Sequence, residues 1–358
     1  TVRAGGEIPS RASAVSAGLD LQAGSWRDSP ADSAYVAPTA GQLYDELDHF
    51  HLPVHPDSSW GEWHYFNLVV APDEWWYFTY LIGGRVGAGR WGGQVLVTHR
   101  TPAGRYERFM QTVPSEGTSF DTARADLTIG GSTVRQSAGT YQPHALARGA
   151  TGEVTIDVRL VPAAQRYFPP VKLQEGEYLS GYVVPALTAI ANGTICSRDR
   201  CSNIHDVPAY HDHNWGVWRD VTWDWGAARG ASVNLLYGGV HTPDTLLTSG
   251  APPFFVAMID SLGVRQILRA REIRYEGSRS ASGAGGTAPD RFTFAAIRDA
   301  DTLRVRVRVE DALATAMRTG GFQRHFLQMR GHFVAQGTVG GQFVSDSGSG
   351  FFETYVRP

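Results

Sequence analysis

Residues Leu303–Val309 read LRVRVRV, and this stretch decides the fold class. Aliphatic side chains alternate with arginines, so one face of an extended chain is apolar and the other face is charged. An alternation of period two predicts an antiparallel β-strand whose valines face a core. We therefore expect far more strand than helix in this protein.

The same kind of pattern recurs on either side of this stretch. Val154–Leu160 alternates apolar and polar residues, and paired glycines at Gly130-Gly131 and Gly340-Gly341 supply the positive φ of tight hairpin turns. No strands alternate with long helices, which argues against a parallel α/β sheet. The fold class that we predict is all-β, with antiparallel barrels or sandwiches.

The chain has 358 residues, enough for one very large or two ordinary domains. Residues 1–40 are rich in Gly, Ala, Ser and Pro without a clear period, and we expect an extended N-terminal arm. The β pattern is interrupted by polar residues and two cysteines near residue 200. We therefore predict an N-terminal β-domain over residues 41–200 and a C-terminal β-domain over residues 201–358.

Charge and hydropathy exclude several classes of partner. The net charge is −3 without a basic block, so we expect no nucleic-acid partner. No apolar run approaches 18 residues, so we expect no transmembrane segment, and peripheral membrane contact and the oligomeric state stay open.

The two cysteines, Cys196 and Cys201, are separated by four residues. A disulfide is the interpretation that we favour, with free thiols as the alternative, because no further cysteine completes a zinc site. The chain begins at Thr1 without an initiator methionine. A processed, exported (periplasmic or extracellular) protein fits this start, although a trimmed chain would begin in the same way.

Tryptophan is concentrated in two parts of the chain, which suggests rigid aromatic walls around an apolar or cationic guest. Ordinary packing of a large barrel is the alternative. The residues of the two clusters are Trp60, Trp63, Trp75, Trp76 and Trp91, and then Trp215, Trp218, Trp223 and Trp225.

The segment Tyr210–Gly216 reads YHDHNWG and is the sharpest candidate for chemistry. On a strand, His211, His213 and Trp215 face one way while Asp212 and Asn214 face the other. Such a face could transfer protons inside an apolar interior, or it could be a buried hydrogen-bond network that fixes strand register. A metal site would need a third ligand, for which His205, Asp206 and His241 are available. We expect no metal and no other cofactor.

Two glutamates lie beside indoles in parallel contexts, Glu62 in GEWHYF and Glu74 in DEWWYF. A carboxyl group in apolar surroundings has a raised pKa and can serve as a general acid, whereas pairing with an arginine is the alternative. The sequence contains no Gly-x-Ser-x-Gly elbow, P-loop or dinucleotide fingerprint.

Four motifs carry a resemblance to a known superfamily. They are Glu74–Phe78 (EWWYF), Ser180–Pro185 (SGYVVP), Tyr210–Gly216 and Gly350–Tyr355 (GFFETY), in that order. Over residues 45–358 the chain resembles the lipocalin-like superfamily of carotenoid 1,2-hydratase (hydroxyneurosporene synthase) and AttH-type proteins, and more distantly tocopherol cyclase and lipocalin-like Diels–Alderases. The resemblance implies two β-barrel-like domains with a ligand tunnel at or near their interface.

The resemblance also implies site residues. His213 and Trp215 match hydratase positions linked to catalysis, and Tyr237 matches a tyrosine on a following strand. Gly238 and Gly239 follow Tyr237 where the hydratase pattern has an acidic residue. Hydration would then need another proton donor, and the candidates are Asp212, Glu74 and Asp260.

These observations support three hypotheses for function. The first is a cofactor-independent enzyme that hydrates, cyclises or isomerises C=C bonds of a long terpenoid, polyprenyl or polyketide substrate. A pericyclase and a non-catalytic carrier of a hydrophobic ligand are the alternatives. The predicted catalytic residues are His213, Asp212, His211, Tyr237 and Glu74. The predicted substrate contacts are Trp215, Trp75, Trp76, Tyr77, Trp223, Trp225 and Asn214.

Overall fold

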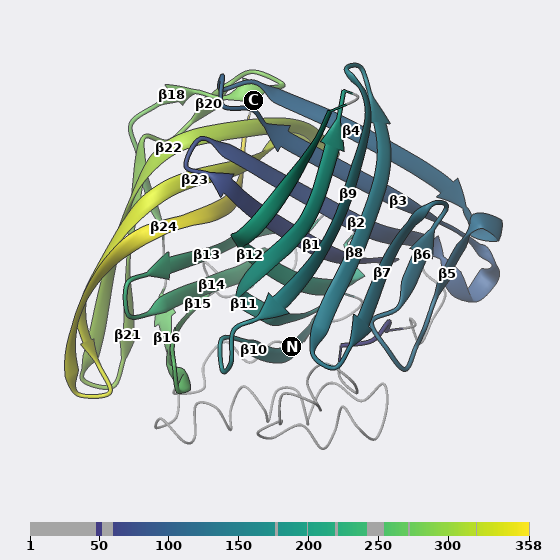
Figure 1. The fold of residues 1–358 in the computed structure, drawn as a ribbon. Coiled ribbons are helices and arrows are strands. Elements are labelled where there is room, and N and C mark those ends of the chain that lie inside the picture. The colour runs from purple at the N-terminus through teal and green to yellow at the C-terminus, as the bar shows by residue number, and fades with distance from the viewer. Residues whose placement is uncertain are drawn as a thin grey trace. The chain divides into compact units, whose positions relative to one another are not determined.

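A computed structural model describes residues 48–51, 60–175, 178–198, 200–218, 221–241, 254–270, 273–319 and 321–357. The predicted N-terminal arm, residues 1–40, lies outside this part of the chain. Within the described ranges almost every residue belongs to a strand, as the alternating patterns predict (Figure 1). None of the helices found there is long and apolar enough to cross a membrane.

Contacts between residues divide the described chain into two compact units, which meet in the sequence between Trp218 and Arg219. The sequence-based boundary at residue 200 lies instead in the turn between two long paired strands of the first unit, β11 and β12. The residues around this turn are polar because this end of the hairpin is exposed, so their composition is similar to that of a linker. The chain continues from there into the interior of the first unit.

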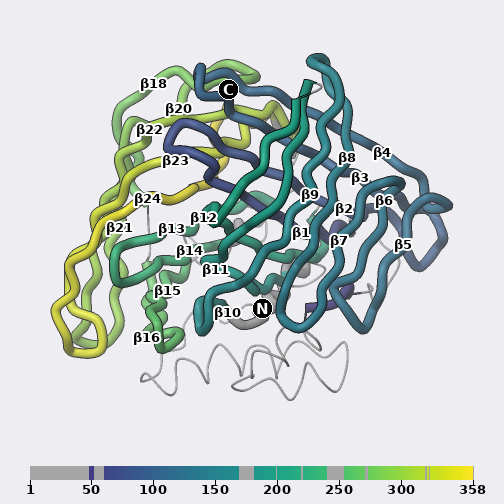
Figure 2. Tube along the Cα trace, viewed as in Figure 1, coloured from purple at the N-terminus to yellow at the C-terminus, as the bar shows by residue number. Residues whose placement is uncertain are grey.

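The first unit contains a closed antiparallel barrel of eight strands in the order β11–β12–β1–β2–β3–β4–β8–β9, with β9 pairing β11 again (Figure 2). Strands β10 and β5 to β7 extend this sheet, and two 3-10 turns interrupt it. The elements are β1 (Trp60–Ala71), β2 (Glu74–Arg85), η2 (Val86–Ala88), β3 (Arg90–Arg100), β4 (Tyr106–Pro114), η3 (Ser115–Gly117), β5 (Thr118–Phe120), β6 (Leu127–Ile129), β7 (Ser132–Ser137), β8 (Thr140–Gly149), β9 (Gly152–Pro162), β10 (Phe168–Glu175), β11 (Tyr178–Ser197) and β12 (Arg200–Val217).

The second unit also closes, in the order β16–β15–β14–β13–β24–β23–β22–β21, because β21 pairs both β22 and β16. Its elements are β13 (Thr222–Gly230), β14 (Asn234–His241), β15 (Phe254–Asp260), β16 (Gly263–Ala270), β17 (Arg274–Glu276), β18 (Arg279–Ser280), β19 (Ser282–Gly283), β20 (Thr287–Ala288), β21 (Arg291–Arg298), β22 (Asp301–Thr319), β23 (Phe322–Val339) and β24 (Gln342–Val356).

The predicted strand Leu303–Val309 is confirmed as part of β22. Its aliphatic side chains are buried in the core of the second unit, and its arginines are exposed. Gly340 and Gly341 both have positive φ, at 60° and 72°, and they connect β23 to β24 as a tight hairpin turn. The all-β class is therefore confirmed, whereas the ligand tunnel expected near the domain interface stays a prediction.

The predicted disulfide is also present. Cys196 and Cys201 lie opposite each other at the end of the β11–β12 hairpin, with a Cα–Cα distance of 4.0 Å, and are bonded. Because the two residues are already paired in the ladder, the bond reinforces a turn that the sheet itself defines.

Candidate active site inside the first unit

The YHDHNWG segment lies on β12 between β11 and β1, and its faces alternate as predicted. His211, His213 and Trp215 have no solvent exposure and point into the first unit. Asp212 lies on the opposite face, where it accepts hydrogen bonds from the Tyr210 hydroxyl at 2.6 Å and the Asn214 amide at 2.6 Å. The sequence therefore predicted correctly which side chains share a face.

The imidazole of His213 is held between two carboxylates. Its Nδ1 lies 2.6 Å from Oδ1 of Asp48, and its Nε2 lies 2.9 Å from Oε1 of Glu62. Glu62 belongs to β1, where its neighbour across the ladder is Trp215. His51 completes the group, because its backbone N–H donates to Glu62 at 2.8 Å and its Nδ1 lies 3.1 Å from the same carboxyl group.

Burial and pairing shift the pKa values of this group in different directions. Burial alone would lower the pKa of His213, but its hydrogen bonds to Asp48 and Glu62 raise that pKa to about 9. Burial raises the pKa of Glu62, although contacts with His213 and His51 oppose the shift. Burial would also raise the pKa of Asp48, but its contacts with His211 and His213 hold that pKa well below the usual range. A protonated His213 next to an ionised Asp48 and a readily protonated Glu62 follows from these shifts.

A second chain of hydrogen bonds runs through His211. Its Nδ1 lies 3.0 Å from the carbonyl oxygen of Tyr65, which can only accept, so the proton of a neutral His211 ring is on Nδ1. The lone pair on its Nε2 then faces Nδ1 of His64 at 3.4 Å. The Tyr141 hydroxyl donates to Asp48, which links this chain to the His213 group.

Aromatic rings enclose both chains. The ring of His51 stacks on the indole of Trp215 with centroids 3.6 Å apart, and Phe66 stacks on His211 at 4.1 Å. A Cβ atom added at Gly181 would lie 2.2 Å from the Trp215 indole, so only glycine fits opposite this tryptophan. The polar group thus lies in surroundings of low dielectric constant, where hydrogen bonds and charges interact strongly.

Glu74 and Trp76, two of the predicted site residues, lie further along the strands from His213. Glu74 and Trp76 are on β2, and Trp76 pairs with Leu68 of β1, whereas Tyr80 pairs with His64. Glu74 contacts His99 at 3.0 Å, and His99 stacks on Trp76 at 3.7 Å. Glu74 is therefore not next to His213, and Glu62 is the glutamate that the fold brings there.

Other predicted residues are on the opposite face of the same sheet. Tyr65 pairs with Asp212 on that face, and its ring stacks with Tyr77 at 6.2 Å. Trp75 lies beside Tyr77, with its indole N–H donating to the carbonyl of Pro72. Asp212, Asn214, Trp75 and Tyr77 form a group of their own, separated from the buried histidines by the backbone of the sheet.

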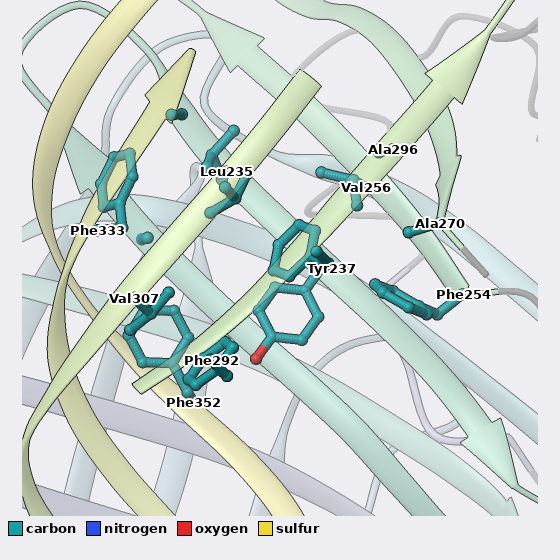
Figure 3. Close-up of a cluster of buried hydrophobic side chains, with 14 of the residues drawn as sticks. Leu235, Tyr237, Phe254, Val256, Ala270, Phe292, Ala296, Val307, Phe333 and Phe352 are labelled. Atoms are coloured by element: carbon teal, nitrogen blue, oxygen red, sulfur yellow. The ribbon is translucent and has the colours of Figure 1, made fainter. Parts of the chain in front are cut away.

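Tyr237, Trp223 and Trp225 belong to the second unit. Tyr237 lies in its apolar core among Phe254, Phe292 and Phe352 (Figure 3). Trp223 lies on the neighbouring strand β13, and its indole N–H donates a hydrogen bond to the Glu353 carboxyl group at 3.0 Å. Burial raises the pKa of Glu353 to about 7, although hydrogen bonds from Trp223 and Gln328 oppose the shift. Sequence reasoning did not identify this carboxyl group.

Two groups of three buried side chains have the types that hold a metal ion, with ligand atoms within 4.8 Å of one another: Asp48, His64 and His211, and His51, Glu62 and His213. The further ligands of these groups therefore come from β1 and residues 48–51, and not from His205, Asp206 or His241, which the sequence offered. In the second group the N···O separations of 2.9 and 3.1 Å are shorter than the roughly 3.3 Å between ligands of tetrahedral zinc. They match hydrogen bonds, so we interpret the cluster as a proton network. The absence of a metal stays a prediction.

The residues missed by sequence reasoning at this site are Asp48, His51, His64 and Tyr141. His64 carried a usable signal, because it alternates with Glu62 on one face of β1. Asp48, His51 and Tyr141 come from distant parts of the chain, so no local pattern connects them with His213.

No family model matches the chain, and no curated protein matches it. Solved structures do match. A protein described as AttH from Nitrosomonas europaea is 14% identical, with a TM-score of 0.55 over 84% of this chain and 93% of that one. Kievitone hydratase from Nectria haematococca is 13% identical, with a TM-score of 0.55 over 88% and 98%. CghA, solved with Sch210972, is 10% identical, with a TM-score of 0.52 over 88% and 96%. At these identities the likeness establishes a shared fold, which is the fold that the resemblance implied.

Proposed function

We propose that this chain, which shares its fold with a hydratase, is a cofactor-independent enzyme that transfers a proton to a C=C bond of a long apolar substrate. The substrate class is a terpenoid, polyprenyl or polyketide chain. The observation that carries the proposal is the position of His213 between the carboxyl groups of Asp48 and Glu62, inside an aromatic interior.

Glu62 is the proton donor in this proposal. Burial raises its pKa, so its neutral form persists to higher pH than that of an exposed glutamate. The O–H proton passes to one carbon of the double bond, and the π electrons form the new C–H bond. A tertiary carbocation and a Glu62 carboxylate result, and the carboxylate keeps its hydrogen bonds to His213 and His51.

The cation then has three fates, and each returns one proton to Glu62. Addition of water forms a C–O bond and gives an alcohol. Attack by a second double bond followed by loss of a proton gives a ring. Loss of a neighbouring proton gives the isomer. The rings of Trp215 and His51 lie beside the Glu62 carboxyl group. The face of an indole ring stabilises a nearby positive charge by about 0.5–2 kcal/mol.

A pericyclase and a carrier remain the competing functions. A pericyclase would lower the barrier by folding a polyene and would not need Glu62 as an acid. A carrier would bind the same ligands without turnover. Neither alternative requires a histidine between two carboxyl groups, which is why proton transfer is the function that we propose.

The deciding experiment compares Glu62→Gln with Glu74→Gln on linear terpenoid and polyene substrates in heavy water. Glutamine keeps the shape and can hydrogen-bond, but it cannot donate an acidic proton. We expect Glu62→Gln to lose about 10²-fold or more in rate, and Glu74→Gln to act as the matched control with near-normal rate. The product of the unchanged protein should carry solvent deuterium on carbon. Full activity of Glu62→Gln, or a product without deuterium, would contradict the proposal.

A further inference from the structure

Two buried polar atoms of the first unit lack a hydrogen-bond partner among the described residues and come from facing positions. They are Nε2 of His64 and the hydroxyl of Tyr80. The two residues pair directly across the β1–β2 ladder, and both side chains have no solvent exposure. An unsatisfied polar group in a protein interior costs about 1–3 kcal/mol, so two such atoms at paired positions require a shared explanation.

The hydrogen-bond chain fixes which kind of atom His64 offers. The carbonyl of Tyr65 can only accept, so His211 donates from Nδ1 and has its lone pair on Nε2. That lone pair lies 3.4 Å from Nδ1 of His64, which must therefore be the donor of this contact. The proton of neutral His64 is thus on Nδ1, and its Nε2 carries a lone pair that faces the interior. Burial lowers the pKa of His64 well below its usual value, which agrees with a neutral ring.

Tyr80 supplies the complementary group. Its hydroxyl can donate one hydrogen bond and accept others, and it does not bond to His64 directly. Phe66 and Phe78 pack against the Tyr80 ring, whereas His64 lies among Asp48, His211 and His213. A small molecule with both a donor and an acceptor satisfies both side chains at once, and water is the smallest such molecule.

We propose that His64 and Tyr80 hold a water molecule, which donates to Nε2 of His64 and accepts from the Tyr80 hydroxyl. This water is the nucleophile of a hydration reaction. Its oxygen forms the C–O bond to the carbocation, and its proton passes to Nε2 of His64, which leaves an imidazolium at His64 and a carboxylate at Glu62. Loss of one proton from His64 to solvent and uptake of one proton by Glu62 then restore both groups. The catalytic part rests on the proposed function, whereas the water site does not.

The first test uses stability and needs no substrate. Tyr80→Phe removes one of the two groups that hold the water, so we expect a lower Tm and a non-additive Tm change in the double variant with His64→Phe. Tyr237→Phe is the matched control, because its hydroxyl is also buried without a partner among the described residues but is surrounded by phenylalanines. That control should keep or raise its Tm. If Tyr80→Phe also raises the Tm, the water site is wrong.

The second test is a high-resolution crystal structure of the unchanged protein. We expect a water oxygen within about 2.7–3.2 Å of both atoms. A direct contact between His64 and Tyr80, or an anomalous signal from a metal at Asp48, His64 and His211, would overturn the inference. These outcomes do not depend on catalysis, so the water site is tested even if the folded variants turn over no substrate.

The third test compares the amounts of the alcohol, the cyclised product and the isomerised product. In ¹⁸O-labelled water with geranylgeraniol as the probe, Tyr80→Phe should lower the labelled alcohol relative to the cyclised and isomerised products by about 10-fold. An unchanged product ratio would contradict a role for this water. Loss of all products in the unchanged protein would instead count against the proposed function, while the first two tests still decide the water site.

Discussion

At the scale of single residues, His213 is the side chain whose removal should cost the most. Its imidazole separates two buried carboxyl groups, so His213→Ala leaves Asp48 and Glu62 without the charge between them. Breaking a buried ion pair on one side costs about 3–5 kcal/mol. We expect that loss in the free energy of unfolding, measured by urea denaturation at pH 7.

The pH dependence of this loss has a definite sign. The pKa of His213 rises from 6.5 to about 9 on folding, so its contribution is complete below pH 6.5 and disappears as the pH rises through 9. The difference between His213→Ala and the unchanged protein should shrink over that window. His144→Ala removes a half-buried imidazole from the same unit and is the control for the substitution itself. A constant difference up to pH 10 would mean that His213 is neutral in the folded protein.

Glu353 gives a pH effect of the same sign in the second unit, but at lower pH. Its pKa rises from 4.5 to about 7 on folding, so the folded state binds the proton more tightly. Its contribution is complete below pH 4.5 and is lost as the pH rises through 7, by up to about 3 kcal/mol. Glu353→Gln should remove this part of the pH dependence and be more stable than the unchanged protein at pH 8. Equal stability of the two at pH 8 would show that Trp223 and Gln328 fully compensate the charge.

At the scale of elements, the β11–β12 hairpin shows where sequence reasoning succeeds and where it fails. The alternation of His211, His213 and Trp215 on one face follows from the two-residue period of a strand, which is a local property. The domain boundary was misplaced because the exposed hairpin end has the composition of a linker. Pairing with β11, and with β1, which is distant in sequence, assigns residues 201–218 to the first unit.

The disulfide at that hairpin end should matter little for stability. Cys196 and Cys201 are already opposite each other in the ladder, and the loop that they close is short. The double substitution Cys196→Ser and Cys201→Ser should lower the free energy of unfolding by at most about 2 kcal/mol. Intact-mass measurement of the unreduced protein should show two hydrogens fewer than the reduced form. Two thiols open to alkylation in the native protein would remove this bond and the main support for our proposal of an oxidising, exported location.

At the scale of the whole molecule, both barrels were predictable as a class because alternation and turn glycines repeat along the chain. The site was predictable only in part. Glu62 and His64 lie on the same face of β1. Glu62 contacts His213, 151 residues away, and His64 contacts His211, 147 residues away, because of the register of β1 against β12. Register is set by burial of the complete face rather than by any local motif. Asp48 and His51 lie outside the barrel strands, so strand patterns carried no information about them.

The pH dependence of turnover should decide among the three functions that this fold supports. If neutral Glu62 donates the proton, the rate falls as the pH rises through its pKa, which burial places above 4.5, and the fall follows a single titration. Glu62→Asp, which keeps an acid but shortens its reach, should retain this limb at a reduced rate. A pericyclase should show a nearly flat profile where the protein remains folded, and a carrier should bind the substrate without forming product. Because unfolding also depends on pH, the rate should be compared with circular dichroism in the same buffers. A flat profile with intact strands would refute proton transfer by Glu62 while leaving the fold and its buried network unchanged.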